Sequence, residues 1–303
     1  MTPQGWARAS LEITAQSYNT MRLAYGGRGV WRLQTAGMTR SLPALSGATA
    51  SHVPSWSRFF MEPVRAAFEY GRMATMPRAA PRRGDGHAVI VFPGLASNQR
   101  ATAPLVSFCE DLGFRACDWG LGFNVGPRGD IDQWLSDLSQ HVEGIRSRVG
   151  GSMTLIGWSL GGIYAREVAK LLPGRVRQVI TIGTPFAGTE TSTRVGWLYR
   201  LVSGQPARMT SGLARRLARS PGVPTTSIYS RSDGVVAWEA CVQPDGRQRE
   251  NIEVQGSHCG MAWNPDVLSI VADRLAQQDG AWRKYQPPRV GANSEARWSL
   301  GSR

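Results

Sequence analysis

Residues 153–162 of this chain read Met153-Thr154-Leu155-Ile156-Gly157-Trp158-Ser159-Leu160-Gly161-Gly162. A short apolar run leads into a Gly-x-Ser-x-Gly pentapeptide, and a stretch with helical periodicity follows. Strand, sharp turn and helix form the context in which this motif carries a nucleophilic serine. The turn predicts a strained backbone at Ser159, with glycine at 157 and 161 because a Cβ would not fit at so close a strand–helix crossing. An ordinary tight turn is the alternative interpretation.

The chain from residue 85 to residue 280 alternates between strand and helix patterns. Strands are expected at 88–92, 114–119, 153–157, 176–183, 225–229 and 252–254. Helices are expected at 102–112, 131–149, 160–172 and 266–278. This order predicts an α/β fold, in which helices cover both faces of a mostly parallel sheet. The long interruption at residues 187–223 predicts a small helical cap insertion above the strand tips.

The segments outside residues 85–280 differ from them in composition. Residues 1–84 predict an N-terminal extension that is partly helical and partly flexible, because residues 37–54 are rich in Ser, Ala, Gly and Pro. Residues 281–303 have little apolar content and predict a disordered tail. Within the extension, residues 56–70 predict an amphipathic helix whose apolar face holds Phe60, Val64, Ala67 and Phe68. Such a helix either packs on the main domain or makes weak peripheral contact with a membrane.

The net charge of +13 comes almost entirely from arginine, since lysine occurs only at 170 and 284. The arginines are scattered and no nucleic-acid motif accompanies them. A compositional bias toward arginine over the whole surface is therefore favoured over nucleic-acid binding. Weak attraction to a membrane or to an anionic substrate is the remaining alternative. No run of about eighteen apolar residues exists, and the first eight residues lack the order of a secretory signal. We therefore expect a cytoplasmic protein; no oligomeric state is predicted.

Four cysteines occur, at 109, 117, 241 and 259. Their spacing contains no Cys-x-x-Cys pair, so zinc and thioredoxin-like chemistry are not indicated. Cys241 and Cys259 flank a predicted strand, which leaves a disulfide between them open. Free thiols are favoured, because a cytoplasmic chain is kept reduced.

A nucleophilic serine needs a base, and the base needs an acid that orients it. Of the four histidines, only His258 comes in a loop straight after the last predicted strand, where a parallel sheet gathers its chemistry. Asp233 follows the preceding strand at 225–229 and is the candidate acid, although Asp-Gly is also a common turn. The resulting order is Ser159, Asp233, His258.

An oxyanion hole for such a serine needs two N–H donors. One is expected from the backbone of Leu160, next to the nucleophile and at the start of a helix. The second is expected from Leu95, because Gly94 permits a turn after the first strand that aims this N–H inward.

Five segments in this order resemble the α/β-hydrolase superfamily, and most closely its bacterial lipase- and esterase-like branch. They are Phe92-Pro93-Gly94-Leu95, residues 157–162, residues 183–188, Ser232-Asp233-Gly234 and Gly256-Ser257-His258. The resemblance covers about residues 87–275. It implies a sheet of about eight strands and ester hydrolysis through an acyl-serine intermediate. One departure concerns the oxyanion loop, since many lipases have His-Gly where this chain has Pro93-Gly94.

The function expected from these residues is that of a serine carboxylester hydrolase that needs no metal and no organic cofactor. Its substrate is a small-molecule or lipid ester with an apolar acyl group. Apolar residues near the predicted strand tips are candidates for the acyl pocket, the alternative being that half of them are core: Trp158, Phe92, Leu121, Phe123 and Phe186. An acyltransferase that uses the same acyl-serine is one alternative function, and a non-catalytic binding module is another.

Overall fold

The computed structural model describes residues 54–76, 84–187 and 211–287. All of them belong to one compact unit, which spans residues 49–303. The expectations for residues 1–53, for most of the cap at 188–210 and for the tail at 288–303 lie outside the described residues. The described part of the expected tail includes Tyr285, whose backbone N–H donates a 2.7 Å hydrogen bond to Glu250 Oε2.

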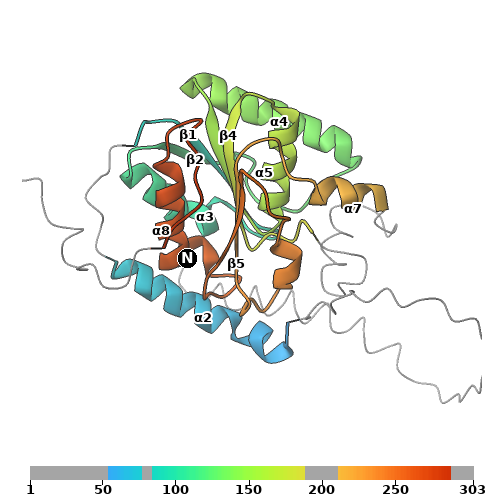
Figure 1. Ribbon diagram of the computed structural model, residues 1–303. Coiled ribbons are helices and arrows are strands. Elements are labelled where there is room, and N and C mark those ends of the chain that lie inside the picture. Colours follow the sequence, from blue (N-terminus) through green and yellow to red (C-terminus); the bar gives the residue numbers. More distant parts are fainter. Residues whose placement is uncertain (1–53, 77–83, 188–210, 288–303) are drawn as a thin grey trace, which may run out of the picture. The chain divides into compact units, whose positions relative to one another are not determined.

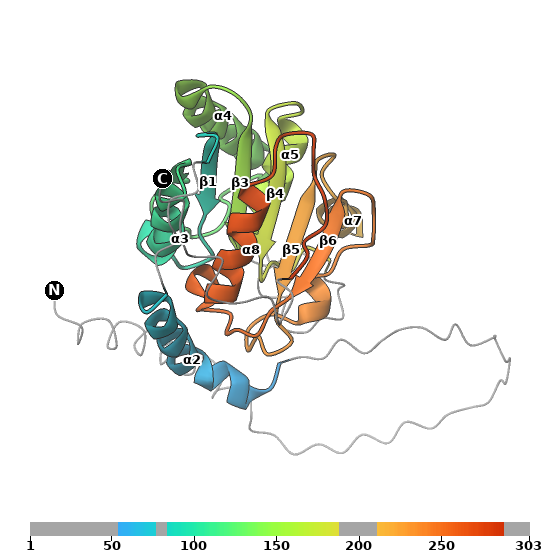
Figure 2. The same ribbon diagram turned by 60° about the vertical axis from the view of Figure 1, so that its left-hand side comes forward.

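A parallel sheet forms the centre of the fold (Figure 2). Its strands in the described residues are β1 (Ala88–Phe92), β2 (Arg115–Asp118), β3 (Met153–Trp158), β4 (Val176–Ile182), β5 (Thr225–Tyr229) and β6 (Arg249–Glu253). Their order is β2-β1-β3-β4-β5-β6, and every neighbouring pair is parallel. The described residues therefore hold six strands rather than the expected eight or so. The described chain before β1 contains one helix, at Trp56–Ala74, and no strand.

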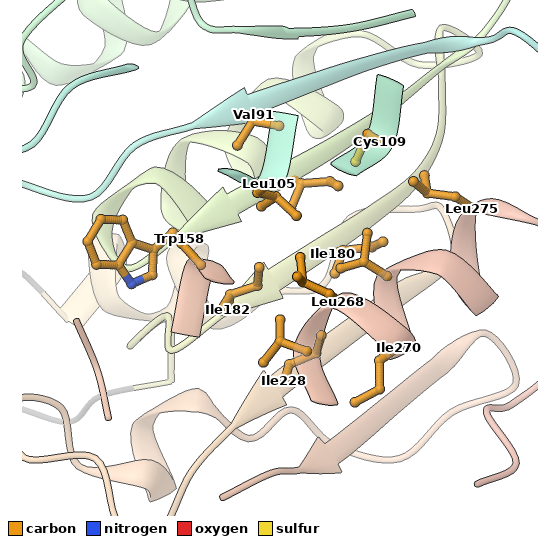
Figure 3. Packing of buried hydrophobic residues seen from close by; sticks show 14 of the residues in the cluster. Val91, Leu105, Cys109, Trp158, Ile180, Ile182, Ile228, Leu268, Ile270 and Leu275 are labelled. Carbon is orange, nitrogen blue, oxygen red and sulfur yellow. The ribbon is translucent and has the colours of Figure 1, made fainter. Parts of the chain in front are cut away.

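Helices cover both faces of the sheet (Figure 1). They are α2 (Trp56–Ala74), α3 (Gln99–Asp111), α4 (Ile131–Val149), α5 (Leu160–Leu171), α7 (Ser211–Ala218) and α8 (Pro265–Leu275). Side chains alternate along each strand, so Ile90 packs toward α4 and α5 while Val89 and Val91 pack toward α3 and α8. Figure 3 shows the second of these clusters, in which Leu105 of α3 and Leu268 of α8 face Ile180 of the sheet.

Two elements begin earlier in the chain than expected, and in both a polar side chain accounts for the difference. α3 begins at Gln99 because Asn98 caps it by accepting a hydrogen bond from the N–H of Arg100. β6 begins three residues before the expected strand, at Arg249. Its Glu250 is buried and pairs with Arg274 of α8 at 2.7 Å, so a charged residue occupies an interior position that a hydrophobic pattern does not reveal.

Helix α2 packs on the domain through its polar face. Its buried residues are Glu62, Ala66 and Glu69. The apolar side chains of the expected face point outward, and Phe68 is 70% exposed. None of the described helices combines the length and the apolar character that a membrane span requires.

Candidate active site

Ser159 stands at the tight junction between β3 and α5. Its backbone has φ 54° and ψ −124°, in the left-handed half of conformational space, which L residues rarely adopt. Such a conformation costs on the order of 1–3 kcal/mol and is kept only where the surroundings enforce it. The N–H of Ser159 donates a 2.8 Å hydrogen bond to Ile182 O on β4, which anchors the junction to the sheet.

Glycines make this junction sterically feasible. A Cβ at Gly157 would overlap the backbone of Gly162, and a Cβ at Gly161 would overlap the carbonyl oxygen of Phe92. The expectation that these two glycines serve a close strand–helix crossing is confirmed. Gly162 has the same role, because a Cβ there would overlap the side chain of Thr184.

The three side chains named from the sequence form one hydrogen-bonded chain. His258 Nδ1 lies 2.7 Å from Asp233 Oδ2, and His258 Nε2 lies 3.0 Å from Ser159 Oγ. An ionised carboxylate can only accept, so Nδ1 is the donor and Nε2 is left to accept the serine proton. All three are buried, with Ser159 only 8% exposed. The arrangement is that of a serine nucleophile, a base and an orienting acid.

Asp233 is held from its other side as well. Its Oδ1 accepts hydrogen bonds of 2.7 Å from the N–H groups of Val235 and Val236. The turn after β5 therefore satisfies one carboxylate oxygen and leaves the other for His258. An Asp-Gly turn and a triad acid are compatible at this position, because the turn itself aims the carboxylate.

The pKa of His258 is raised from its ordinary value of 6.5. Burial alone would lower it, since burial penalises the charged imidazolium. The negative charge of Asp233 and the hydrogen bond to it outweigh burial, and the charge of Glu62 acts in the same direction. The site thus stabilises a protonated imidazole, the form that a general base reaches during the reaction.

The two backbone amides expected to form an oxyanion hole are both without a backbone acceptor among the described residues. Leu160 is the first residue of α5, and among the described residues no acceptor takes its N–H. The N–H of Leu95 is likewise without a backbone acceptor in the described part of the chain, whereas the next residue, Ala96, donates to Asn124 O. Ala96 has a positive φ of 55°, and Gly94 packs against Ser159, where a Cβ would come within 3.2 Å of the serine Cβ.

Known proteins resemble this chain in structure and, over shorter stretches, in sequence. No protein-family model matches the chain. Aspergillus fumigatus lipase B has a similar structure, with a TM-score of 0.50 and 18% identity over 69% of this chain and 55% of that one. Bacillus licheniformis lipase BlEst2 gives a TM-score of 0.50 and 15% identity, over 65% of this chain and 94% of that one. The chain has the α/β-hydrolase fold.

Two curated proteins match the sequence of this chain over shorter stretches. The pimeloyl-[acyl-carrier protein] methyl ester esterase of Shewanella woodyi is 28% identical over 102 residues, 33% of this chain. The serine hydrolase BPHL of Mus musculus is 29% identical over 121 residues, 38% of this chain. The matched stretches span 37% and 42% of those two proteins.

The residues that the sequence analysis named for an acyl pocket fall into two groups. Phe92 and Phe186 are fully buried, and Phe186 lies under the guanidinium of Arg166 at 3.8 Å from its ring centre. Trp158 is also buried, and its indole N–H donates a 3.0 Å hydrogen bond to His258 O. Leu121 and Phe123 are exposed instead, on the segment that leads to Asn124 beside the oxyanion loop.

Sequence reasoning missed the helix α2 as part of this site. Its Glu62 accepts hydrogen bonds from the N–H groups of Gly234 and Cys259, each the direct neighbour of a triad residue. Its Glu69 accepts from the N–H and the hydroxyl of Ser257. The available signal is the spacing of these glutamates, seven apart with the small Ala66 between them, which puts a narrow polar stripe on one helix face.

The four cysteines of this chain are free thiols, including Cys241 and Cys259, so the disulfide that the sequence left open is absent from the structure. Burial, together with the charges of Glu62 and Asp233, raises the pKa of the Cys259 thiol to about 12. A thiol with so high a pKa is a poor nucleophile. Ser159 is therefore the reactive side chain that the geometry favours.

Proposed function

We propose that this chain is a serine hydrolase of carboxylic esters, with Ser159 as nucleophile, His258 as base and Asp233 as the orienting acid. The observation that carries the proposal is the continuous hydrogen-bonded chain from Asp233 through His258 to a serine held in a strained turn. The names of the similar proteins, an esterase, a serine hydrolase and two lipases, support the same class of reaction.

The first half of the reaction forms an ester on the enzyme. Ser159 Oγ attacks the carbonyl carbon of the substrate while His258 Nε2 takes the hydroxyl proton. The carbonyl electron pair moves to oxygen, and the N–H groups of Leu95 and Leu160 stabilise the resulting oxyanion. When the pair returns, the bond to the alkoxide breaks, and His258 gives that leaving group its proton.

The second half releases the acid. A water molecule attacks the acyl-serine as His258 removes its proton, and the same two amides hold the second oxyanion. Collapse breaks the acyl–Oγ bond, and the proton on His258 returns to Ser159. Asp233 keeps the Nδ1–H tautomer and favours the imidazolium through its charge, without taking the proton itself.

The proposed substrates are small-molecule or lipid esters with an apolar acyl group. The exposed Leu121 and Phe123 support this choice, because they give the rim beside the oxyanion loop an apolar surface. No cofactor is needed for either half of the reaction.

The test is turnover of a panel of p-nitrophenyl esters that differ in acyl length. We expect hydrolysis by the unaltered protein and a loss on the order of 10⁶ in kcat for Ser159→Ala. A fluorophosphonate probe should label the unaltered protein and not this variant. Transfer of the acyl group to added alcohols, amines or thiols in place of water would identify an acyltransferase. An unlabelled Ser159 in the unaltered protein would leave only the binding-module interpretation.

We further propose that the outward face of α2 makes peripheral contact with an anionic lipid surface. Trp56 and Phe60 stack on this face, and Phe60 and Phe68 are 63% and 70% exposed. The two acidic residues of the helix are both buried on its inner side, so the exposed side chains are apolar, uncharged or basic. Together with the net charge of +13, this face suits the interface of a negatively charged bilayer. A cytoplasmic location stays a prediction.

A further inference from the structure

Helix α2 lies outside the α/β core but contacts both loops that carry the base and the acid (Figure 1). The contacts join residues that are 167 to 197 positions apart in the sequence. One end of the helix meets the loop after β5, and its polar face continues across the loop after β6. No other described helix makes hydrogen bonds to both of these loops.

Glu62 bridges the two loops with one carboxylate. Its Oε1 accepts from the N–H of Gly234 at 2.8 Å, and its Oε2 accepts from the N–H of Cys259 at 2.9 Å. Gly234 follows Asp233 directly and Cys259 follows His258 directly. Glu62 is only 2% exposed, so these hydrogen bonds form away from water, where an unpaired amide or carboxylate is costly. A rigid group of fixed size thus sets the separation of the two loop backbones.

Two more side chains of α2 reinforce this bridge. Glu69 Oε1 accepts from the N–H of Ser257 at 2.7 Å, and its Oε2 accepts from the Ser257 hydroxyl at 3.0 Å. Arg65 donates to the carbonyl oxygen of Ser232 at 2.6 Å and to its hydroxyl at 2.8 Å. Each triad residue on these loops, Asp233 and His258, therefore has α2 contacts to the residues before and after it.

Glycines on the two loops leave the space that helix α2 occupies. A Cβ at Gly234 would come within 2.7 Å of the Arg58 carbonyl oxygen and 2.8 Å of Glu62 Oε1. A Cβ at Gly260 would overlap Glu69 Oε2. The loop sequences are thus sterically matched to a helix in this position.

We propose that α2 is a positioning element of the active site, in which Glu62 holds the acid loop and the base loop at the separation that the Asp233–His258–Ser159 chain requires. The effect on kcat that this inference predicts rests on the proposed function. Glu62 does not reach the reacting atoms; it acts through the backbone of Gly234 and Cys259.

Because Glu62 is charged, its contact with the base loop should also affect the pKa of His258. The charged and titratable groups that face the His258 region are Asp233, Glu62, Glu69, Arg65 and Cys259. Asp233 has the largest part in raising the pKa of His258 against burial, and Glu62 adds to it. Removing the Glu62 charge should therefore lower that pKa, which a purely structural contact would not do.

The experiment compares two variants of the full chain. Glu62→Gln keeps the length of the side chain but loses its charge and one of its acceptors. Glu62→Asp keeps the charge but is one methylene too short to bridge both amides. Glu143→Gln is the matched control, because Glu143 pairs with Arg146 on the exposed side of α4. The measurements are kcat and KM on a p-nitrophenyl ester, the pKa of His258 by NMR titration, and thermal unfolding.

We expect both Glu62 variants to lower kcat by about 10- to 100-fold, since small misplacements of catalytic groups have effects of this size. KM should stay within about threefold, because neither loop is expected to bind the acyl group. Only Glu62→Gln should move the His258 pKa and the acidic limb of the rate profile to lower pH. Glu143→Gln should match the unaltered protein.

Unchanged kcat and unchanged His258 pKa in a folded Glu62→Gln variant would overturn the inference while leaving the proposed function intact. A protein that hydrolyses no ester, but whose His258 pKa falls in Glu62→Gln, would refute the proposed function and retain the positioning role. If Glu62→Gln does not fold, Glu69→Gln gives the second test. It removes the bond to the Ser257 hydroxyl or N–H and should lower kcat by several-fold, and an unchanged kcat there would also count against the proposal.

Discussion

The indole N–H of Trp158 donates a hydrogen bond of 3.0 Å to the backbone carbonyl of His258. The residue before the nucleophile therefore fixes the backbone of the base. Replacing this indole by phenyl in Trp158→Phe leaves a buried carbonyl without its donor, which costs about 1–3 kcal/mol. We expect a lower melting temperature and a kcat reduced several-fold, measured by calorimetry and ester hydrolysis. A variant as stable and as active as the unaltered protein would show that the bond is dispensable.

The rate should depend on pH through His258. Its imidazole must be neutral to accept the serine proton, and its pKa is raised above 6.5. Protonation therefore inactivates the site, so kcat/KM should rise with pH through a midpoint above 6.5 and level off beyond it. A pH–rate profile with an uncharged ester measures this midpoint. A midpoint below 6.5 would contradict the conclusion that Asp233 raises the pKa of His258 by more than burial lowers it.

Two glycine-to-alanine substitutions in helices should have opposite effects. Gly162→Ala in α5 places a methyl group against Thr184 and should destabilise the protein by about 1–3 kcal/mol or more. Gly144→Ala in α4 meets no atom within 4 Å and should stabilise it by about 0.5–1 kcal/mol, because alanine favours helix. Urea unfolding of both variants provides the comparison. Equal shifts would mean that the strand–helix crossing is looser than the structure has it.

The outward face of α2 should govern attachment to anionic vesicles. Phe60→Ala with Phe68→Ala removes two large exposed aromatic side chains and should weaken co-sedimentation with phosphatidylserine-containing vesicles about tenfold or more. Leu171→Ala, which removes an exposed leucine at the end of α5, is the control and should bind as before. Hydrolysis of a water-soluble ester should be unaffected by either change. Equal binding of all three proteins would refute the lipid contact.

The core of the fold and the three triad side chains were accessible from the sequence for a shared reason. Ser159, Asp233 and His258 each follow a segment whose apolar pattern predicts a strand, and parallel strands end at one edge of the sheet. At these three residues, the local sequence pattern is therefore enough to predict the place of the side chain in the fold. The prediction that the amides of Leu95 and Leu160 form an oxyanion hole uses the same logic, because Leu95 lies in the loop after β1 and Leu160 opens α5.

The remaining features depend on tertiary contacts that no local pattern encodes. Glu62 and Glu69 look like solvated charges on a helix, and only the neighbouring loops show that they are buried acceptors. Glu250 likewise occupies an interior position because Arg274 of a distant helix neutralises it. The inverted orientation of α2, with its aromatic side chains outward, follows from these buried polar contacts rather than from hydrophobicity.

A chain shortened to begin at β1 would keep the whole sheet and every triad residue, and it would still be defective. Four donors near the triad would lose their acceptors: the N–H groups of Gly234, Ser257 and Cys259 and the hydroxyl of Ser257. Water would enter where the helix had been, and the loops would be free to drift apart. Anyone producing this protein in trimmed form should therefore set the first residue upstream of Ser55, the helix cap, rather than at the start of the recognisable domain.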